Sequence, residues 1–282
     1  MEKRILGRTG EKLSVVGFGG IVVTDTTPRE AAAYVKEAVE RGVNYFDVAP
    51  TYGNAQERLG PALEPYRKDV FLACKTVKRT RDEAAEQVKA SLEMLRTDHV
   101  DLYQFHGVTT AEDVETILAP GGALEAFVEA REKGLVRHIG FSAHSEEAAL
   151  GLMKGFDFDS ILFPLNFVTW YKEDFGPRVI EEAQKRGMGI LALKALALRS
   201  WKDGETKKWP KCWYKPVDTY DEAEIALRWT LSLPVTAAVS PSHAELLWWA
   251  CDAAERLNPI SAIEETGLQA KAETLAAIFP EG

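Results

Sequence analysis

The chain alternates short apolar runs with amphipathic segments, and this alternation recurs about every 30 residues along most of its length. The runs are rich in β-branched and aromatic residues, which favour strands. A strand that is apolar throughout is buried on both faces, and a helix after each strand supplies the cover. We therefore predict a parallel sheet built from VVGFGG (15–20), NYFDVA (44–49), VFLACKT (70–76), VDLYQFH (100–106), VRHIGFS (136–142), DSILFPLN (159–166), MGILALK (188–194) and VTAAVS (235–240).

Helices are expected between these strands, and several have clear start signals. Thr27 to Glu30 combines an N-cap residue, a proline at the first helical position and a capping-box glutamate, and Gly42 marks the end of that helix. A threonine followed three residues later by a glutamate recurs at 80–83 and 219–222. Further helices are predicted at 123–133, 145–154 and 177–186.

Eight strand–helix units favour a closed barrel over a doubly wound open sheet, which usually has five or six strands. The segment VGFGG lacks the GxGxxG spacing of a dinucleotide-binding turn, and no helix follows it at once. The prediction is an α/β protein, a (β/α)8 TIM barrel, with residues 1–282 forming one domain. A short N-terminal β-hairpin is expected from RILG and KLSV, and a long inserted loop rich in Trp is expected at about 195–218.

Composition excludes several other classes of protein. The 34 Lys and Arg residues against 43 Asp and Glu residues give a formal net charge of −9, so the chain lacks the basic surplus of a nucleic-acid binder. No apolar run approaches the roughly 20 residues that cross a bilayer, and no secretory signal is visible at the N-terminus. The three cysteines lie far apart and without metal-ligand spacing, so we expect no metal site and a cytoplasmic location.

Four ionisable side chains follow three consecutive predicted strands. Asp47 lies near the end of the second strand and Tyr52 just after it, while Lys75 and His106 end the third and fourth. The carboxyl ends of barrel strands form the mouth where chemistry occurs, so these side chains should converge there. The Lys75 ammonium would lower the pKa of the Tyr52 phenol, Asp47 would keep Lys75 charged, and His106 would hydrogen-bond a substrate oxygen. Such a group predicts a carbonyl-reduction site that lacks only a hydride.

The strings that carry these residues resemble the aldo-keto reductase family over nearly the whole chain. They are LSVVGFGG, FDVAPTYG, LACKT, DLYQFH, VRHIGFSAHS and GMGILALKAL. The resemblance implies a (β/α)8 barrel whose bottom is closed by a hairpin, an extended nicotinamide dinucleotide, and reduction of aldehydes or ketones. It also implies that Asp47, Tyr52, Lys75 and His106 form the family's catalytic tetrad, with Tyr52 as the general acid and base.

The resemblance further implies a set of cofactor-binding residues. Ser142 matches the serine that bonds the nicotinamide carboxamide, and Asn166 falls where a second amide-recognising side chain is expected. Gly20 and Ile21 would lie beside the nicotinamide ribose. The sequence departs from the family at Ala143-His144, where an Asn usually follows the serine, and at Leu193, where an aromatic ring often stacks on the nicotinamide. Lys194, which follows Leu193, could contact a phosphate.

The last strand–helix loop bears on the choice of nucleotide. NADPH-preferring members of the family place Lys and Arg around the adenosine 2′-phosphate, whereas VSPSHAELL (239–247) contains neither. Ser240 and Ser242 are the cofactor-binding candidates in this loop, and Ser242 with Glu245 has the capping-box pattern of a helix start that could receive a phosphate. The resemblance therefore indicates NADP(H), with NAD(H) left open.

The sequence predicts an NAD(P)H-dependent oxidoreductase that acts on small carbonyl substrates. Two alternatives stay open: a nucleotide-binding regulatory subunit with little turnover, and a phosphate-binding barrel lyase or isomerase, although the latter's Gly-rich loops are absent. His144 and His243 fit solvent exposure as well as ligand contact, and Lys207, Lys208 and Lys211 are interpreted as a solvated loop. Aromatic residues that could face substrate are Trp170, Trp201, Trp209 and Trp213. The oligomeric state cannot be read from the sequence.

Overall fold

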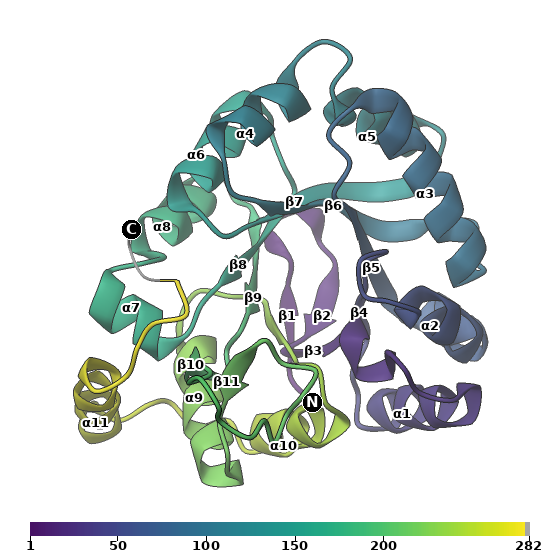
Figure 1. Ribbon diagram of the computed structural model, residues 1–282. Coiled ribbons are helices and arrows are strands. Elements are labelled where there is room, and N and C mark those ends of the chain that lie inside the picture. Colours follow the sequence, from purple (N-terminus) through teal and green to yellow (C-terminus); the bar gives the residue numbers. More distant parts are fainter. Residues whose placement is uncertain (280–282) are drawn as a thin grey trace.

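A computed structural model describes residues 1–279 and forms a closed barrel of parallel strands, as predicted (Figure 1). The barrel order is β12-β3-β4-β5-β6-β7-β8-β9, so each strand pairs with the next in sequence and the last closes on the first. All eight predicted runs form these strands. Their bounds are β3 Val16–Gly19, β4 Tyr45–Asp47, β5 Phe71–Thr76, β6 Val100–Val108, β7 Val136–Ala143, β8 Ser160–Pro164, β9 Gly189–Leu193 and β12 Ala237–Val239.

Helices cover the outside of the barrel (Figure 1). They are α1 Pro28–Glu40, α2 Ala55–Leu63, α3 Arg81–Leu95, α4 Ala111–Leu118, α5 Ala123–Glu132, α6 Glu146–Gly155, α7 Phe167–Glu173, α8 Pro177–Lys185, α9 Tyr220–Ser232, α10 Ala244–Ala254 and α11 Ala262–Glu273. The capping box predicted at Thr27 is complete, because its side chain accepts from Glu30 N–H and the Glu30 carboxylate accepts from Thr27 N–H. At α3 the Thr80 hydroxyl instead donates to the Glu83 carboxylate, 2.6 Å away.

A hairpin of β1 (Lys3–Ile5) and β2 (Lys12–Ser14) closes the bottom of the barrel, as predicted. Figure 1 shows the two strands lying across the centre of the ring of strands. The Leu6 and Leu13 side chains are fully buried and pack into the barrel interior. Their partners there are Tyr45, Phe71, Ala73, Leu102, Leu162, Leu191 and Ala237. The interior is therefore filled by side chains from below, at the end of the barrel away from the carboxyl ends of the strands.

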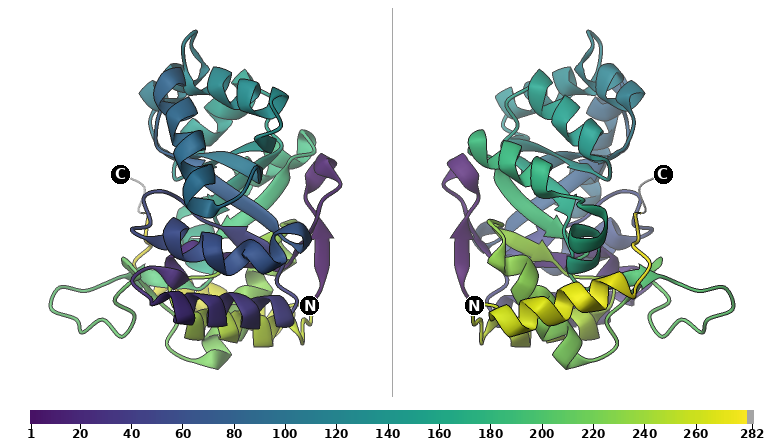
Figure 2. Two further views of the ribbon diagram at one scale, coloured as in Figure 1. Left: turned by 90° about the vertical axis from the view of Figure 1, so that its right-hand side faces the viewer. Right: turned by 90° about the vertical axis from the view of Figure 1, so that its left-hand side faces the viewer.

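The segment 195–218 is more ordered than the inserted loop that the sequence predicts. It contains β10 (Ala197–Ser200) and β11 (Tyr214–Pro216), which pair antiparallel at its base. The Arg199 guanidinium also holds both oxygens of Glu205 at 2.8 Å. Figure 2 shows the rest of the segment extending from the end of the barrel opposite the β1–β2 hairpin. This excursion, residues 195–218, therefore stands beside the mouth of the barrel.

The described residues, 1–279, contain no helix that is long and apolar enough to cross a membrane.

Candidate functional site

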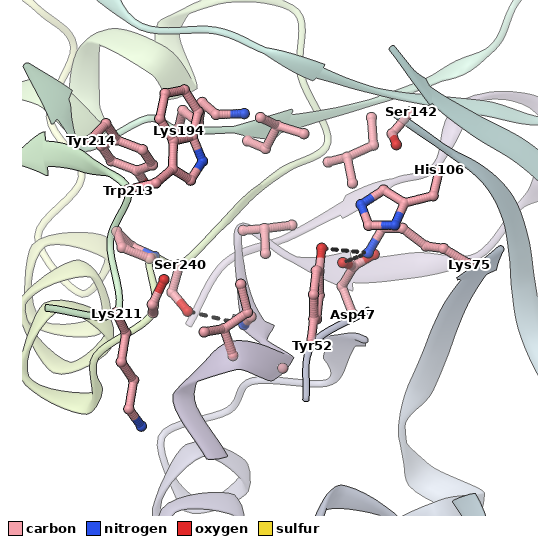
Figure 3. Close-up of a pocket in the computed structure, with 18 of the residues that line it drawn as sticks. Asp47, Tyr52, Lys75, His106, Ser142, Lys194, Lys211, Trp213, Tyr214 and Ser240 are labelled. Carbon is pink, nitrogen blue, oxygen red and sulfur yellow. Dashed lines mark hydrogen bonds and ion pairs between the residues drawn. The ribbon is translucent and has the colours of Figure 1, made fainter. Parts of the chain in front are cut away.

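A pocket lies at the mouth of the barrel, where the carboxyl ends of most strands contribute side chains (Figure 3). The four ionisable residues singled out in the sequence all line it, and three lysines do so from separate segments. The lining residues are Gly19, Gly20, Ile21, Asp47, Tyr52, Lys75, His106, Ser142, His144, Leu162, Leu193, Lys194, Lys211, Trp213, Tyr214, Val239, Ser240, Pro241 and Ser242. Within residues 1–279 no cluster of His, Cys, Asp and Glu is suited to hold a metal ion.

The Lys75 ammonium lies at the centre of the four residues that the sequence singles out. Lys75 is fully buried, and its Nζ donates to the Asp47 carboxylate and lies 3.3 Å from the Tyr52 hydroxyl. The other Asp47 oxygen accepts from Gln104 Nε2 at 3.0 Å and from the Tyr45 hydroxyl at 3.2 Å. A carboxylate with this many donors is held in one orientation, so Asp47 fixes where the ammonium meets the phenol.

Burial and neighbouring charge set the protonation states of Lys75 and Tyr52. Burial alone would lower the pKa of Lys75, but the Asp47 carboxylate and the Tyr52 hydroxyl together outweigh burial, and the pKa of Lys75 is raised. For Tyr52, burial raises the pKa of the phenol more than the Lys75 ammonium lowers it. The ammonium therefore acts in the expected direction, but burial outweighs it and the pKa of Tyr52 is raised. Tyr52 is a protonated phenol at neutral pH.

His106 lies against the ring of Tyr52. The two rings meet edge to face with centroids 5.6 Å apart, and His106 Nδ1 is 3.3 Å from the Thr51 hydroxyl oxygen. Burial, together with the nearby Lys75 charge, lowers the pKa of His106 to about 3. The imidazole is therefore neutral at pH 7. In the tautomer in which Nδ1 accepts from the Thr51 hydroxyl, Nε2–H is a donor available to the pocket.

Most of the residues expected to bind a cofactor line the same pocket. Gly20, Ile21, Ser142, Leu193, Lys194, Ser240 and Ser242 do so, whereas Asn166 is not among its lining residues. Asn166 Oδ1 instead accepts from the N–H groups of Val168 and Thr169 and caps α7. Its Nδ2 is buried and has no partner within residues 1–279. A buried amide donor without a partner is uncommon, and a ligand carbonyl would satisfy it.

The start of α10 differs from the predicted capping box. His243, and not Ser242, is the N-cap residue, and no side chain caps the first turn. Ser242 instead lines the pocket, and Ser240 Oγ accepts from Gly19 N–H at 3.0 Å. The uncapped N–H groups of this turn, close to two pocket serines, suit an anionic group.

Lys211 is a pocket residue, so its interpretation as part of a solvated loop is wrong. Its Nζ donates to the carbonyl oxygens of Val22 and Thr24, and its backbone N–H donates to His243 Nε2 at 3.1 Å. These contacts tie the excursion to the 3-10 turn after β3 and to the start of α10. The sequence shows the lysine but not the carbonyls it reaches, which lie almost 190 residues earlier.

The aromatic residues divide differently from the prediction. Trp213 and Tyr214 line the pocket, but Trp209 is buried against Trp249 and His243. Trp170 packs edge to face on Trp229, with ring centroids 5.8 Å apart. The Trp201 indole donates to Cys212 O within the excursion at 2.9 Å. Only Trp213 of the four predicted candidates therefore faces the pocket.

Comparison with known protein families gives a match across most of the chain. A model described as the aldo/keto reductase family matches residues 15–248. An uncharacterized oxidoreductase of Bacillus subtilis is 31% identical over 198 residues, which are 65% of this chain and 62% of the relative. An L-galactose dehydrogenase of Arabidopsis thaliana is 34% identical over 157 residues, which are 50% of this chain and 48% of the relative. The chain thus spans between about half and three fifths of the length of these curated relatives.

A comparison with solved structures covers nearly the whole chain. The holo form of an aldo-keto reductase from Bacillus halodurans matches with a TM-score of 0.76 and 26% identity, covering 99% of this chain and 98% of that one. An aldo-keto reductase of Brucella melitensis has a TM-score of 0.71 at 20% identity. The second likeness concerns the fold alone.

Proposed function

Because the chain belongs to the aldo/keto reductase family, we propose that it reduces small aldehydes or ketones to alcohols with a nicotinamide dinucleotide. The observation that carries this proposal is the contact between the Lys75 ammonium and the Tyr52 hydroxyl, 3.3 Å apart at the barrel mouth. A protonated phenol beside a fixed cation can give up its proton without leaving an unstabilised phenolate.

The roles of the four residues follow from their charges. Tyr52 donates a proton to the carbonyl oxygen, and Lys75 stabilises the phenolate that remains. Asp47 keeps Lys75 charged and in place through the buried ion pair. Neutral His106 donates from Nε2 to the same carbonyl oxygen and orients it. The bound nicotinamide would supply the hydride.

The residues of the pocket fit a nicotinamide dinucleotide. The pocket-facing Ser142 suits a carboxamide. The unpartnered Nδ2 of Asn166 would join it only where the carboxamide reaches past the lining residues. The uncapped start of α10 and Lys211 suit phosphate groups. We propose NADP(H) as the cofactor, with NAD(H) as the alternative, because the loop at 239–247 supplies no Lys or Arg for a 2′-phosphate.

The test measures binding and turnover separately. NADH and NADPH are titrated against protein fluorescence, and oxidation is then followed with a panel of small aldehydes in wild type and Tyr52→Phe. Tyr66→Phe is the matched control, because Tyr66 lies in the 3-10 segment Glu64–Asp69 that precedes β5, at the other end of that strand from Lys75.

We expect turnover in wild type and Tyr66→Phe and a loss of about 100-fold or more in Tyr52→Phe, since general acid catalysis contributes about 10²–10⁴-fold. Full turnover in Tyr52→Phe would refute the role of Tyr52. Cofactor binding without turnover in wild type would favour a nucleotide-binding regulatory subunit.

A further inference from the structure

A second lysine in the pocket has no counter-charge. Lys194 follows directly after β9, is 8% exposed and lines the pocket. No carboxylate within residues 1–279 forms an ion pair with it, whereas Lys75 pairs with Asp47 in the same pocket. Burial lowers the pKa of Lys194 to about 7. An ammonium that is buried without an anion is costly, and an anionic ligand would relieve the cost.

The surroundings of Lys194 hold its ammonium toward the pocket. Its Nζ is 3.2 Å from His144 Nε2 and faces the rings of Trp213 and Phe279 at 5.3 and 4.9 Å. Burial and the Lys194 charge lower the pKa of His144 to about 3, so His144 is a neutral acceptor that positions Nζ. Phe279 also stacks on His144, with centroids 5.3 Å apart.

The backbone of Lys194 is unusual as well. Its φ is +65°, in the left-handed region where Gly and Asn are tolerated best. A lysine there carries a backbone cost that a glycine would avoid.

Lys194 and its neighbours lie in the same pocket as the four residues of the proposed reaction. Besides burial, the Lys194 charge helps to lower the pKa of His106, so Lys194 lies near enough to that imidazole to influence its protonation. Figure 3 shows Lys194 and Trp213 across the pocket from Lys75 and Tyr52, and apart from Lys211. An anion bound at Lys194 would thus belong to a molecule that also reaches His106, which on the proposed function touches the carbonyl oxygen.

We propose that Lys194, positioned by His144, binds a carboxylate of the substrate, so that the preferred substrates are aldehydes or ketones that carry an acidic group. The rings of Trp213 and Phe279 would cover the hydrocarbon chain between the carbonyl and the carboxylate. This inference rests on the proposed function and names its substrate class. The rival source of an anion is a phosphate of the cofactor.

The test compares substrates that differ only in the terminal charge. Butanal, pentanal and hexanal are paired with 4-oxobutanoate, 5-oxopentanoate and 6-oxohexanoate, and kcat/KM is measured for each with saturating cofactor. The readout is the ratio of kcat/KM for the acid to that for the neutral aldehyde of the same length. The variants are Lys194→Met, which keeps the length of the side chain, and Lys202→Met, an exposed lysine of the same excursion.

In wild type and Lys202→Met we expect a ratio of about 10 or more for at least one length. In Lys194→Met this ratio should fall by about 10- to 100-fold, as for loss of a hydrogen bond between charged groups. An unchanged ratio in Lys194→Met would overturn the proposal. So would weaker cofactor binding in that variant with both aldehydes slowed by the same factor, because the charge would then serve a cofactor phosphate.

Direct binding separates failure of this inference from failure of the proposed function. Glutarate, a dicarboxylate without a carbonyl to reduce, is titrated into the cofactor-loaded protein by calorimetry. Binding to wild type that is lost in Lys194→Met supports the carboxylate subsite even where no aldehyde is turned over. No glutarate binding to wild type, together with no preference for the acidic aldehydes, overturns the subsite while reduction of neutral aldehydes still stands.

Discussion

The Lys75 ammonium lies 3.3 Å from the Tyr52 hydroxyl while it is paired with the buried Asp47 carboxylate. One cation therefore has two partners: it neutralises a carboxylate that could not stay buried alone, and on the proposed function it would also stabilise the phenolate of Tyr52. The structural and the proposed chemical roles of Lys75 can be separated by experiment.

Replacing Lys75 with Met should abolish turnover and destabilise the fold. The buried Asp47 carboxylate would lose its partner, which costs about 3–5 kcal/mol of unfolding free energy, and the pKa of Tyr52 would rise further. Urea unfolding and kcat/KM measure the two effects. The double variant Asp47→Asn/Lys75→Met, which buries no charge, should regain much of the stability but none of the turnover. A double variant as unstable as Lys75→Met would contradict this account.

The pH dependence of reduction should reflect the raised pKa of Tyr52. A general acid must be protonated, so activity is lost only as the pH rises through the pKa of the phenol. Because burial raises that pKa above its usual value near 10, kcat/KM for a neutral aldehyde should stay level to about pH 9 and fall above pH 10. A fall centred between pH 7 and 8 would assign the proton to another group.

The two histidines of the pocket should make stability depend on pH. Burial lowers the pKa of His144 to about 3 in the folded protein. Between about pH 3 and pH 6.5 the unfolded chain is therefore protonated at His144 while the folded protein is not. Its contribution to stability is present above pH 6.5 and is lost as the pH falls toward 3. As the pH falls below 6.5, the unfolding free energy of His144→Gln should therefore decrease less steeply than that of wild type. The two slopes should differ by up to about 1.4 kcal/mol per pH unit. Urea midpoints at pH 7, 6 and 5 measure the difference, and parallel curves would argue against a buried neutral His144.

Two glycines inside helices allow the cost of tight packing to be compared with the gain in helix propensity. A Cβ at Gly60 in α2 would lie 2.5 Å from Met94 O and 2.8 Å from the Leu95 backbone, whereas nothing lies within 4 Å of one at Gly267 in α11. Gly60→Ala should therefore lose about 1–3 kcal/mol of unfolding free energy by overpacking. Gly267→Ala should gain about 0.5–1 kcal/mol from helix propensity. Equal effects of the two changes would show that α2 and α3 can move apart.

The contacts of Lys211 should slow the release of a bound nucleotide, because they tie the excursion down beside the pocket. In Lys211→Met the excursion would lose its bonds to Val22 O and Thr24 O. We expect the dissociation rate of NADPH, followed by stopped-flow fluorescence, to rise about 10-fold, as for loss of charge-assisted bonds. Lys207→Met, at an exposed lysine of the same excursion, should leave the rate unchanged. A rate that rises equally in both variants would point to a general effect of charge.

The barrel could be predicted because its signal is local. Each strand is a continuous apolar run, and the order of the runs leaves few topologies that bury them. The convergence of Asp47, Tyr52, Lys75 and His106 followed from their places at strand ends. Helix α2 was not predicted, because Gly60 and Pro61 inside it are typical of a turn, and tertiary packing against α3 overrides that preference.

The contacts of the excursion and of Lys194 could not be predicted from local pattern. Lys211 meets carbonyls almost 190 residues earlier, and Lys194 meets His144, 50 residues earlier. The net pKa of Tyr52 also depends on how deeply the folded chain buries it, which residue type and spacing do not report. The sequence suggests an amide-binding role for Asn166, which stays a prediction, but not its role as the cap of α7, although it directly precedes that helix.

The β1–β2 hairpin, which fills the barrel from below, also affects the order in which ligands bind and leave at the mouth. Leu6 and Leu13 occupy the interior, so a molecule that enters the pocket through the mouth has to leave by the same way. When two ligands enter one pocket through the same opening, the ligand that binds second dissociates first. A nucleotide in contact with Lys211 would then bind before the carbonyl substrate and leave after the alcohol in every turnover, and steady-state kinetics should be strictly sequential.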